Sequence, residues 1–180
     1  VALSTAQVRA LTADQIAALG TAQVRALQTT DLQALTSTQI RALTTEQVSA
    51  LTTEQVVSLT TSQVAALQTV DFAALTTVQI RALELADVAV LTASQITALT
   101  TEQAVALTTA QIGALTTVQI AALATDDLAV LTTAQIVALS TAQVQVLSAS
   151  QIAALTTAQI RALEVTDLAA LSVEQVAAFT

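Results

Sequence analysis

Large apolar residues recur along this chain at a fixed spacing of eight. Leu occupies 22 of the 23 positions 3, 11, 19 and onward, from Leu3 to Leu171, and Phe179 ends the row. Counted from Ser4, the chain consists of 22 octapeptides, called octads here, with the consensus [S/T]-T-x-Q-[I/V]-x-A-L. Each unit of such an unbroken repeat meets its neighbours in the same way, which predicts a regular solenoid, coil or tube.

The spacing inside the octad favours a short α-helix. Position 5 is usually Ile or Val and position 8 is Leu, and this offset of three places both on one face of a helix but on opposite faces of a strand. Position 1 is Ser or Thr in 16 octads and position 4 is Gln in 17, and Ser/Thr-x-x-Gln is a capping box. We therefore predict an all-α solenoid of short capped helices, one per octad, with a β-solenoid as the alternative.

One continuous helix does not fit the same pattern. Eight residues turn an α-helix by about 800°, so the Leu row would drift by roughly 80° with every octad. The row would then wind around all faces of the helix, and no partner could bury it. The tandem Thr-Thr pairs that begin many octads also disfavour an uninterrupted helix.

Charged residues occupy the two octad positions that suit the ends of a helix. All five Arg residues stand at position 6, near the predicted helix end: Arg9, Arg25, Arg41, Arg81 and Arg161. Six acidic residues stand at position 3, in the predicted first turn: Asp14, Glu46, Glu54, Glu102, Asp126 and Glu174. Acid at the start and base at the end complement the helix dipole. We expect both positions to face solvent.

Five octads depart from the consensus in two positions together. Asp replaces Gln at position 4 in these octads: Asp31, Asp71, Asp87, Asp127 and Asp167. Position 1 is then Gln28, Gln68, Glu84, Ala124 or Glu164. Two explanations stay open: the Asp caps a helix that starts later, or the preceding helix runs on, for example from Arg161 through Glu164. The recurring interval of five octads also suggests a superhelical repeat of five octads, or two turns of about two and a half octads each.

Composition narrows the class of protein. Apolar residues make up 54% of the chain and charged residues 10%, which excludes the disordered class. Mean hydropathy is +0.71, but every octad carries at least two polar positions, so we expect no membrane span. A net charge of −8 with five Arg residues argues against nucleic acid. We expect residues 1–180 to form one continuous array, cut from a longer one.

The chain offers little chemistry. It contains no His, Lys or Cys that could activate a Ser or Thr nucleophile, so we predict no catalytic residue and no cofactor. Three carboxylate pairs could be considered for Ca²⁺: Asp87 with Glu84, Asp126 with Asp127, and Asp167 with Glu164. Ca²⁺ sites need six or more oxygens and turn glycines, whereas this chain has only Gly20 and Gly113. We therefore predict no metal site.

The octads resemble a known class of repeat. Residues 156–163, Thr-Thr-Ala-Gln-Ile-Arg-Ala-Leu, are similar to the octapeptide tracts of very large bacterial secreted or surface proteins, which are often labelled haem utilisation or adhesion proteins. The resemblance covers the whole chain and implies an extracellular scaffold, adhesin stalk or filament. Haem binding is not carried over, because the chain lacks His, Met, Cys and Tyr, the usual axial ligands.

The function expected from this pattern is structural and non-enzymatic. Stacked octads would form an extracellular fibre, tube or stalk at the cell surface, with self-association, end-to-end or lateral, because heterologous contacts that do not close produce filaments. A solenoid that binds protein or glycan is the alternative. A more remote alternative is an ice-binding array of Thr side chains.

Overall fold

The protein folds as a series of short helices. A computed structural model describes residues 4–179 and contains 22 α-helices within them, one for each octad and with no strand. The all-α prediction is confirmed, and the β-solenoid alternative is wrong. Leu3, the first residue of the Leu row, lies outside the described residues.

The helices fall into two compact units, called unit 1 (Val1–Leu91) and unit 2 (Thr92–Thr180). Unit 1 holds α1 Thr5–Ala10, α2 Ala13–Ala17, α3 Thr21–Arg25, α4 Thr29–Ala34, α5 Ser37–Arg41, α6 Thr45–Ala50, α7 Thr53–Ser58, α8 Thr61–Ala66, α9 Thr69–Ala73, α10 Thr77–Ala82 and α11 Leu85–Ala89. Unit 2 holds α12 Ala93–Thr97, α13 Thr101–Ala106, α14 Thr109–Ala114, α15 Thr117–Ala122, α16 Thr125–Val130, α17 Thr133–Val137, α18 Thr141–Gln145, α19 Ala149–Ala153, α20 Thr157–Ala162, α21 Val165–Ala169 and α22 Val173–Ala177. The prediction of one continuous array stays a prediction.

The helices of the octads that start with Ser or Thr begin at the predicted capping box. In α7, Thr52 Oγ1 accepts from the backbone N–H of Gln55 at 3.2 Å, and Gln55 Oε1 accepts from the N–H of Thr52 at 2.9 Å. Both halves of the box are present in every octad that starts with Ser or Thr. The box satisfies donors of the first turn that have no partner inside the helix.

Each helix ends at or next to the Leu of position 8. Leu59, for example, has φ −60° and ψ 140°, and its N–H donates to the carbonyl oxygen of Val56 at 3.1 Å. This extended backbone takes the chain out of the helix and into the next capping residue. The Leu side chain meanwhile points inward, since Leu59 is 5% exposed. One residue therefore ends the helix and fills the core.

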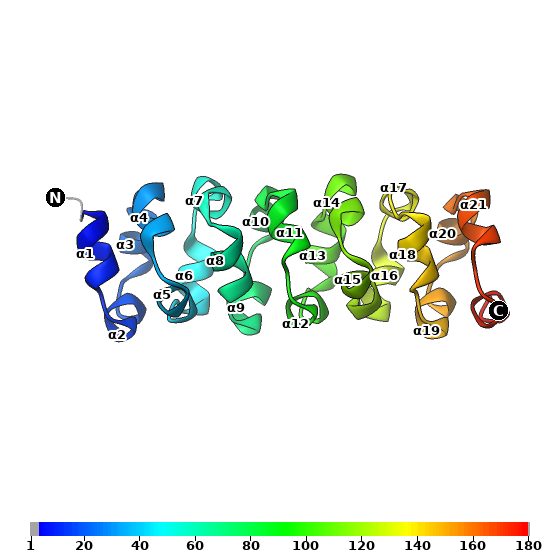
Figure 1. Cartoon of the computed structure of the whole chain (residues 1–180), viewed down its shortest axis with the longest axis horizontal. Helices are drawn as coiled ribbons and strands as arrows, with labels where there is room; N and C mark the ends of the chain where they lie inside the picture. Colours follow the sequence, from blue (N-terminus) through cyan, green and yellow to red (C-terminus); the bar gives the residue numbers. More distant parts are fainter. Residues whose placement is uncertain (1–3, 180) are drawn as a thin grey trace. The chain divides into compact units, whose positions relative to one another are not determined.

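The helices stack on every third neighbour. In unit 1 the stacked series are α1–α4–α7–α10, α2–α5–α8–α11 and α3–α6–α9, and Figure 1 shows the first of these from left to right. In unit 2 they are α12–α15–α18–α21, α13–α16–α19–α22 and α14–α17–α20. Each unit is thus a solenoid with three octads, or 24 residues, per turn. The predicted superhelical repeat of five octads, with its turn of about two and a half octads, is wrong.

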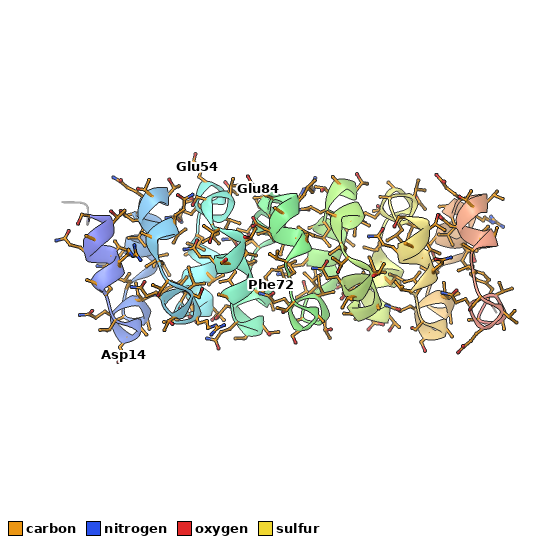
Figure 2. All side chains as sticks on the ribbon, in the orientation of Figure 1. Asp14, Glu54, Phe72 and Glu84 are labelled. Carbon is orange, nitrogen blue, oxygen red and sulfur yellow. The ribbon has the colours of Figure 1, made fainter. Side chains whose placement is uncertain are left out.

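The core of each unit consists of positions 5 and 8. Position 5 is fully buried in every octad from Val8 to Ile152, and the Leu of position 8 is buried from Leu35 to Leu163. All residues at position 3 are exposed, and Figure 2 shows Asp14 and Glu54 projecting outward from the ribbon. Along the described chain, no helix combines the length and apolar character needed to cross a membrane.

Candidate functional site

Acidic and basic side chains lie where the helix dipole favours them. The five Arg residues are all exposed and stand in the last turn of α1, α3, α5, α10 and α20. The six acids of position 3 are all exposed and stand in first turns. Both placements are confirmed. These residues form a charged outer surface and do not converge on one place.

The carboxylate pairs considered for Ca²⁺ are each split between the surface and the interior. Asp126 is exposed whereas Asp127 is 2% exposed, and Glu84 and Glu164 are exposed N-cap residues. Asp87 and Asp167, their partners, are buried. Within residues 4–179, no group of three or more His, Cys, Asp or Glu side chains could hold a metal ion. The prediction that the chain has no catalytic, cofactor or metal site stays a prediction.

The most specific polar feature is a hydrogen bond between turns of the solenoid, called the corner bond here. Gln55 Nε2 donates to the carbonyl oxygens of Val24 at 2.8 Å and Leu27 at 2.9 Å, four octads earlier. These carbonyls stand at the end of α3, where helix carbonyls lack partners. The capping Gln of one octad therefore also donates hydrogen bonds to the end of the helix four octads earlier.

Corner bonds recur with the same sequence separations of 31 and 28 residues. In unit 1 the donors are Gln39, Gln47, Gln55, Gln63 and Gln79. In unit 2 they are Gln135, Gln143, Gln151, Gln159 and Gln175. All these side chains are buried, with at most 5% exposure. The corner bond therefore recurs regularly in the contact between successive turns of each solenoid, which is called the coil contact here.

The sequence predicted that Gln caps its own helix but not that it donates to a helix four octads earlier. A capping box accepts Glu as readily as Gln, yet no octad has Glu at position 4. A carboxylate accepts hydrogen bonds but cannot donate them, whereas the Gln amide does both. The absence of Glu was the available signal that position 4 must also donate.

The Asp octads keep the same helix register, so both explanations offered for them are wrong. As in the other octads, the residue at position 1 is the N-cap and the helix begins at position 2. The N-cap residues of the Asp octads make no side-chain capping bond. Asp167 is the third residue of α21, not its cap, and α20 ends at Ala162 with Leu163 in extended conformation. In octad 9 the residue at position 1 donates a hydrogen bond to the octad four units earlier: Gln68 Nε2 donates to the carbonyl oxygen of Arg41 at 2.7 Å.

The Asp octads also match the octads on which they stack. The octad that lies three octads before each Asp octad has Thr at position 2 and a small residue at position 5. The pairs at position 5 are Leu32 with Val8, Phe72 with Val48, Val88 with Val64, Leu128 with Ala104, and Leu168 with Val144. In one case the Thr contact is direct, since Thr141 Oγ1 donates to Asp167 Oδ1 at 2.7 Å. The paired residues are 24 positions apart in the sequence, and the turn of three octads explains why these positions correspond.

Three buried Asp carboxyls are shifted toward the neutral form. Burial, together with the charges of Asp126 and Glu102, raises the pKa of Asp127 to about 6. Burial and the charge of Glu46 raise the pKa of Asp71. For Asp87, burial raises the pKa against a lowering hydrogen bond from the backbone of Glu84. In each case the largest cause is desolvation, which disfavours the charged form.

A shallow depression of about 360 Å³ lies between α13 and α16. Its lining is Thr101, Glu102, Val105 and Val130. Val105 and Val130 are both 41% exposed, so this depression is an open apolar surface edged by one acid. Within this lining Thr101 Oγ1 donates to Glu102 Oε2 at 3.5 Å, and Glu102 is the one titratable residue of the lining.

The comparisons with known proteins agree with the repeat geometry. The family model of the ALTTAQ repeat matches residues 1–29, 24–61, 64–101, 82–125, 120–157 and 152–180. Searches of curated proteins and of solved structures each give no match. The hexapeptide Ala-Leu-Thr-Thr-Ala-Gln itself occurs at 106–111 and 154–159, where it spans the end of one octad and the capping box of the next. Because the six matches cover nearly every octad, the chain belongs to the ALTTAQ repeat family.

Proposed function

We propose that this chain is a structural scaffold, which acts by its shape and stiffness and not by catalysis. The observation that carries the proposal is the uniform coil contact. Every corner bond joins octads four apart, and every helix stack joins octads three apart. A contact that repeats with the same octad spacing can be extended by adding octads, and stability then grows as a sum over neighbouring units.

The outer surface supports the same function. It combines acids at position 3 with Arg at position 6, and the carboxyls far outnumber the Arg side chains. A net charge far from zero favours solubility of a surface that also exposes Val side chains, such as Val118 at 68% and Val165 at 82%. The hydroxyls of position 1 are engaged in capping boxes, so they are not available as a free Thr array.

We place this scaffold outside the cell, as a stalk, tube or fibre on a bacterial surface. The support is the resemblance of the octads to tracts of very large secreted and surface proteins. Copies of the chain would associate with each other, end-to-end or laterally, and a cell-surface or matrix partner belongs to the same proposal.

Electron microscopy of the purified chain tests the proposal. We expect rods or fibres of constant width, and fibres longer than one chain would support self-association. Phe72→Ser should abolish these particles, because Phe72 is fully buried and its loss leaves a cavity in the core. Val70→Ser is the matched control, since Val70 is 63% exposed on the same helix. Irregular globular particles from the unaltered chain would contradict the proposal.

A further inference from the structure

The Asp octads put an acceptor where the coil contact is built for a donor. Gln at position 4 accepts from its cap N–H and donates across the corner. An ionised carboxylate can only accept, whereas a protonated carboxyl also has one O–H to donate. The corner carbonyls four octads before Asp127 are those of Ile96 and Leu99 in unit 2. A charged Asp127 therefore cannot replace the missing amide, but a neutral Asp127 has the required donor.

Three of these carboxyl groups have an oxygen without a hydrogen-bond partner in the interior. Among the described residues, Oδ2 of Asp71, Asp87 and Asp127 is buried and has no hydrogen-bond partner. A buried polar atom without a partner costs about 1–3 kcal/mol, and more when it is charged. Asp167 differs, because its Oδ1 accepts from Thr141. The unpartnered oxygens thus mark three places where ionisation weakens the coil contact.

The surroundings of Asp127 contain no charge that would stabilise its carboxylate. Glu102 of α13 and Asp126 of its own helix face it, while α19, the helix stacked on its other side, carries no titratable residue. Hydrogen bonds to its own backbone and to Thr100 lower the pKa of Glu102, so Glu102 stays charged when Asp127 takes up a proton. Two like charges close together favour one neutral partner.

Asp71 and Asp87 lie in similar surroundings in unit 1. Glu46 of α6 faces Asp71, and hydrogen bonds lower the pKa of that glutamate as they do for Glu102. Glu84 of the same octad is the charged neighbour of Asp87, and α8, on which α11 stacks, has no titratable residue. The buried, unpartnered carboxyl oxygen is therefore repeated in three octads, and octad 9 differs in that Gln68 Nε2 also donates to the carbonyl oxygen of Arg41.

We propose that Asp127, together with Asp71 and Asp87, is a protonation-dependent joint of the solenoid, whose neutral carboxyl donates its O–H across the coil contact in place of the Gln amide. Mild acid then tightens the stacking of these octads, and neutral or basic solution loosens it. Octads with Gln hold their neighbours at any pH, so the array combines permanent contacts with a few that respond to acidity.

The sign follows from proton linkage. The unfolded carboxyl has an ordinary pKa near ~3.9, whereas the folded pKa of Asp127 is about 6. Between these values the folded state binds more protons than the unfolded state, so stability falls as pH rises. Lowering the pH from about 7 through about 6 therefore stabilises the fold, and the gain levels off below the unfolded pKa.

Urea unfolding of the full chain between pH 7.5 and pH 4.5 tests the proposal. The urea midpoint of the unaltered chain should rise as the pH falls. The triple variant Asp71→Asn, Asp87→Asn and Asp127→Asn, which supplies neutral donors, should have a higher midpoint at pH 7.5 and little pH dependence. The control variant Asp14→Asn, Glu54→Gln and Glu174→Gln removes the same charge from exposed positions and should keep the pH dependence of the unaltered chain.

The opposite pattern overturns the proposal: a buried triple variant that keeps the pH dependence, or a surface control that loses it. A direct measurement covers the case in which the triple variant does not fold. Carboxyl ¹³C NMR of the unaltered chain, with Asp127→Asn to assign the resonance, should show Asp127 titrating near the value of about 6. Titration near the ordinary value of about 4 would overturn the proposal by itself.

Discussion

At the scale of the residue, one side chain decides how this solenoid holds together. The Gln of position 4 closes the start of its own helix through Oε1 and the end of a helix four octads earlier through Nε2. Both ends of the amide are used, and both groups are buried. The otherwise similar Glu can make only the first contact. The identity of this residue is therefore set by the coil contact, and its place in the octad by the helix start.

Gln55→Glu is expected to destabilise the fold by about 2–4 kcal/mol, because it removes two donated bonds and buries a charge against carbonyl oxygens. The control is Gln15→Glu in α2. Gln15 makes the same capping box with Thr12 but is exposed, so the change should cost less than about 1 kcal/mol. Urea unfolding at neutral pH measures both. Equal losses in the two variants would show that the corner bond contributes nothing.

At the scale of the element, the octads are not interchangeable, although their helices are alike. Phe72 in α9 and Val48 in α6 belong to stacked helices, and both are fully buried. Leu128 in α16 stands in the same relation to Ala104 in α13. In four of the five Asp octads a large residue at position 5 is thus matched by a smaller one three octads earlier, and the fifth pair is Val88 with Val64. Since cores are close-packed, the summed volume of such a pair is constrained more than either residue alone.

Val48→Ile should therefore cost about 1–3 kcal/mol, since it adds a methylene beneath Phe72 in a filled core. Val56→Ile is the matched control, because α7 stacks on α10 and the residue above is Ile80. The control should change stability by less than about 1 kcal/mol. Thermal unfolding followed by circular dichroism gives both values. A larger loss in Val56→Ile would contradict the size match.

At the scale of the whole molecule, the turn of three octads sets which octads meet. Removing a single octad gives the three octads after the deletion new stacking neighbours and moves every later octad to another side of the coil. Removing three octads also changes three stacking neighbours but leaves the later octads on their original sides. Deletion of residues 60–67 places octad 9, with Phe72, over octad 5, with Ile40. Deletion of residues 44–67 places it over octad 3, with Val24. The second deletion removes three times as much core but keeps a small residue beneath Phe72.

We expect the deletion of residues 44–67 to leave a higher urea midpoint than the deletion of residues 60–67. Loss of repeats lowers the stability of a repeat array in proportion to the neighbours removed, so length alone predicts the reverse order. Urea unfolding of the two deletion variants decides between the two orders. A lower midpoint for the longer deletion would show that length outweighs the match between octads.

Local structure could be predicted from the sequence because its causes lie within eight residues. The offset of three between Ile or Val and Leu, the Ser/Thr–Gln box and the placement of Arg and acid each depend on neighbours inside one octad. For this reason the helix starts, the helix ends and the exposed charged positions were confirmed. The Asp octads were predicted wrongly at the same local scale, because their helices start at the usual position and Asp167 bonds Thr141 of another octad, which the sequence of a single octad does not show.

The contacts between turns were decided by the tertiary structure alone. The common core pattern gives no sequence signal for whether an octad meets its third or its fifth neighbour, because any choice brings Leu and Ile or Val together. Only the pairing of each Asp octad with the octad 24 residues earlier follows the turn of three octads. The backbone bend at Leu59 and its equivalents sets the turn at three octads. That turn brings Gln55 to the end of α3 and leaves Asp127 buried beside Glu102. The sequence by itself determined the unit and its buried face, and the angle between successive units determined which polar groups meet.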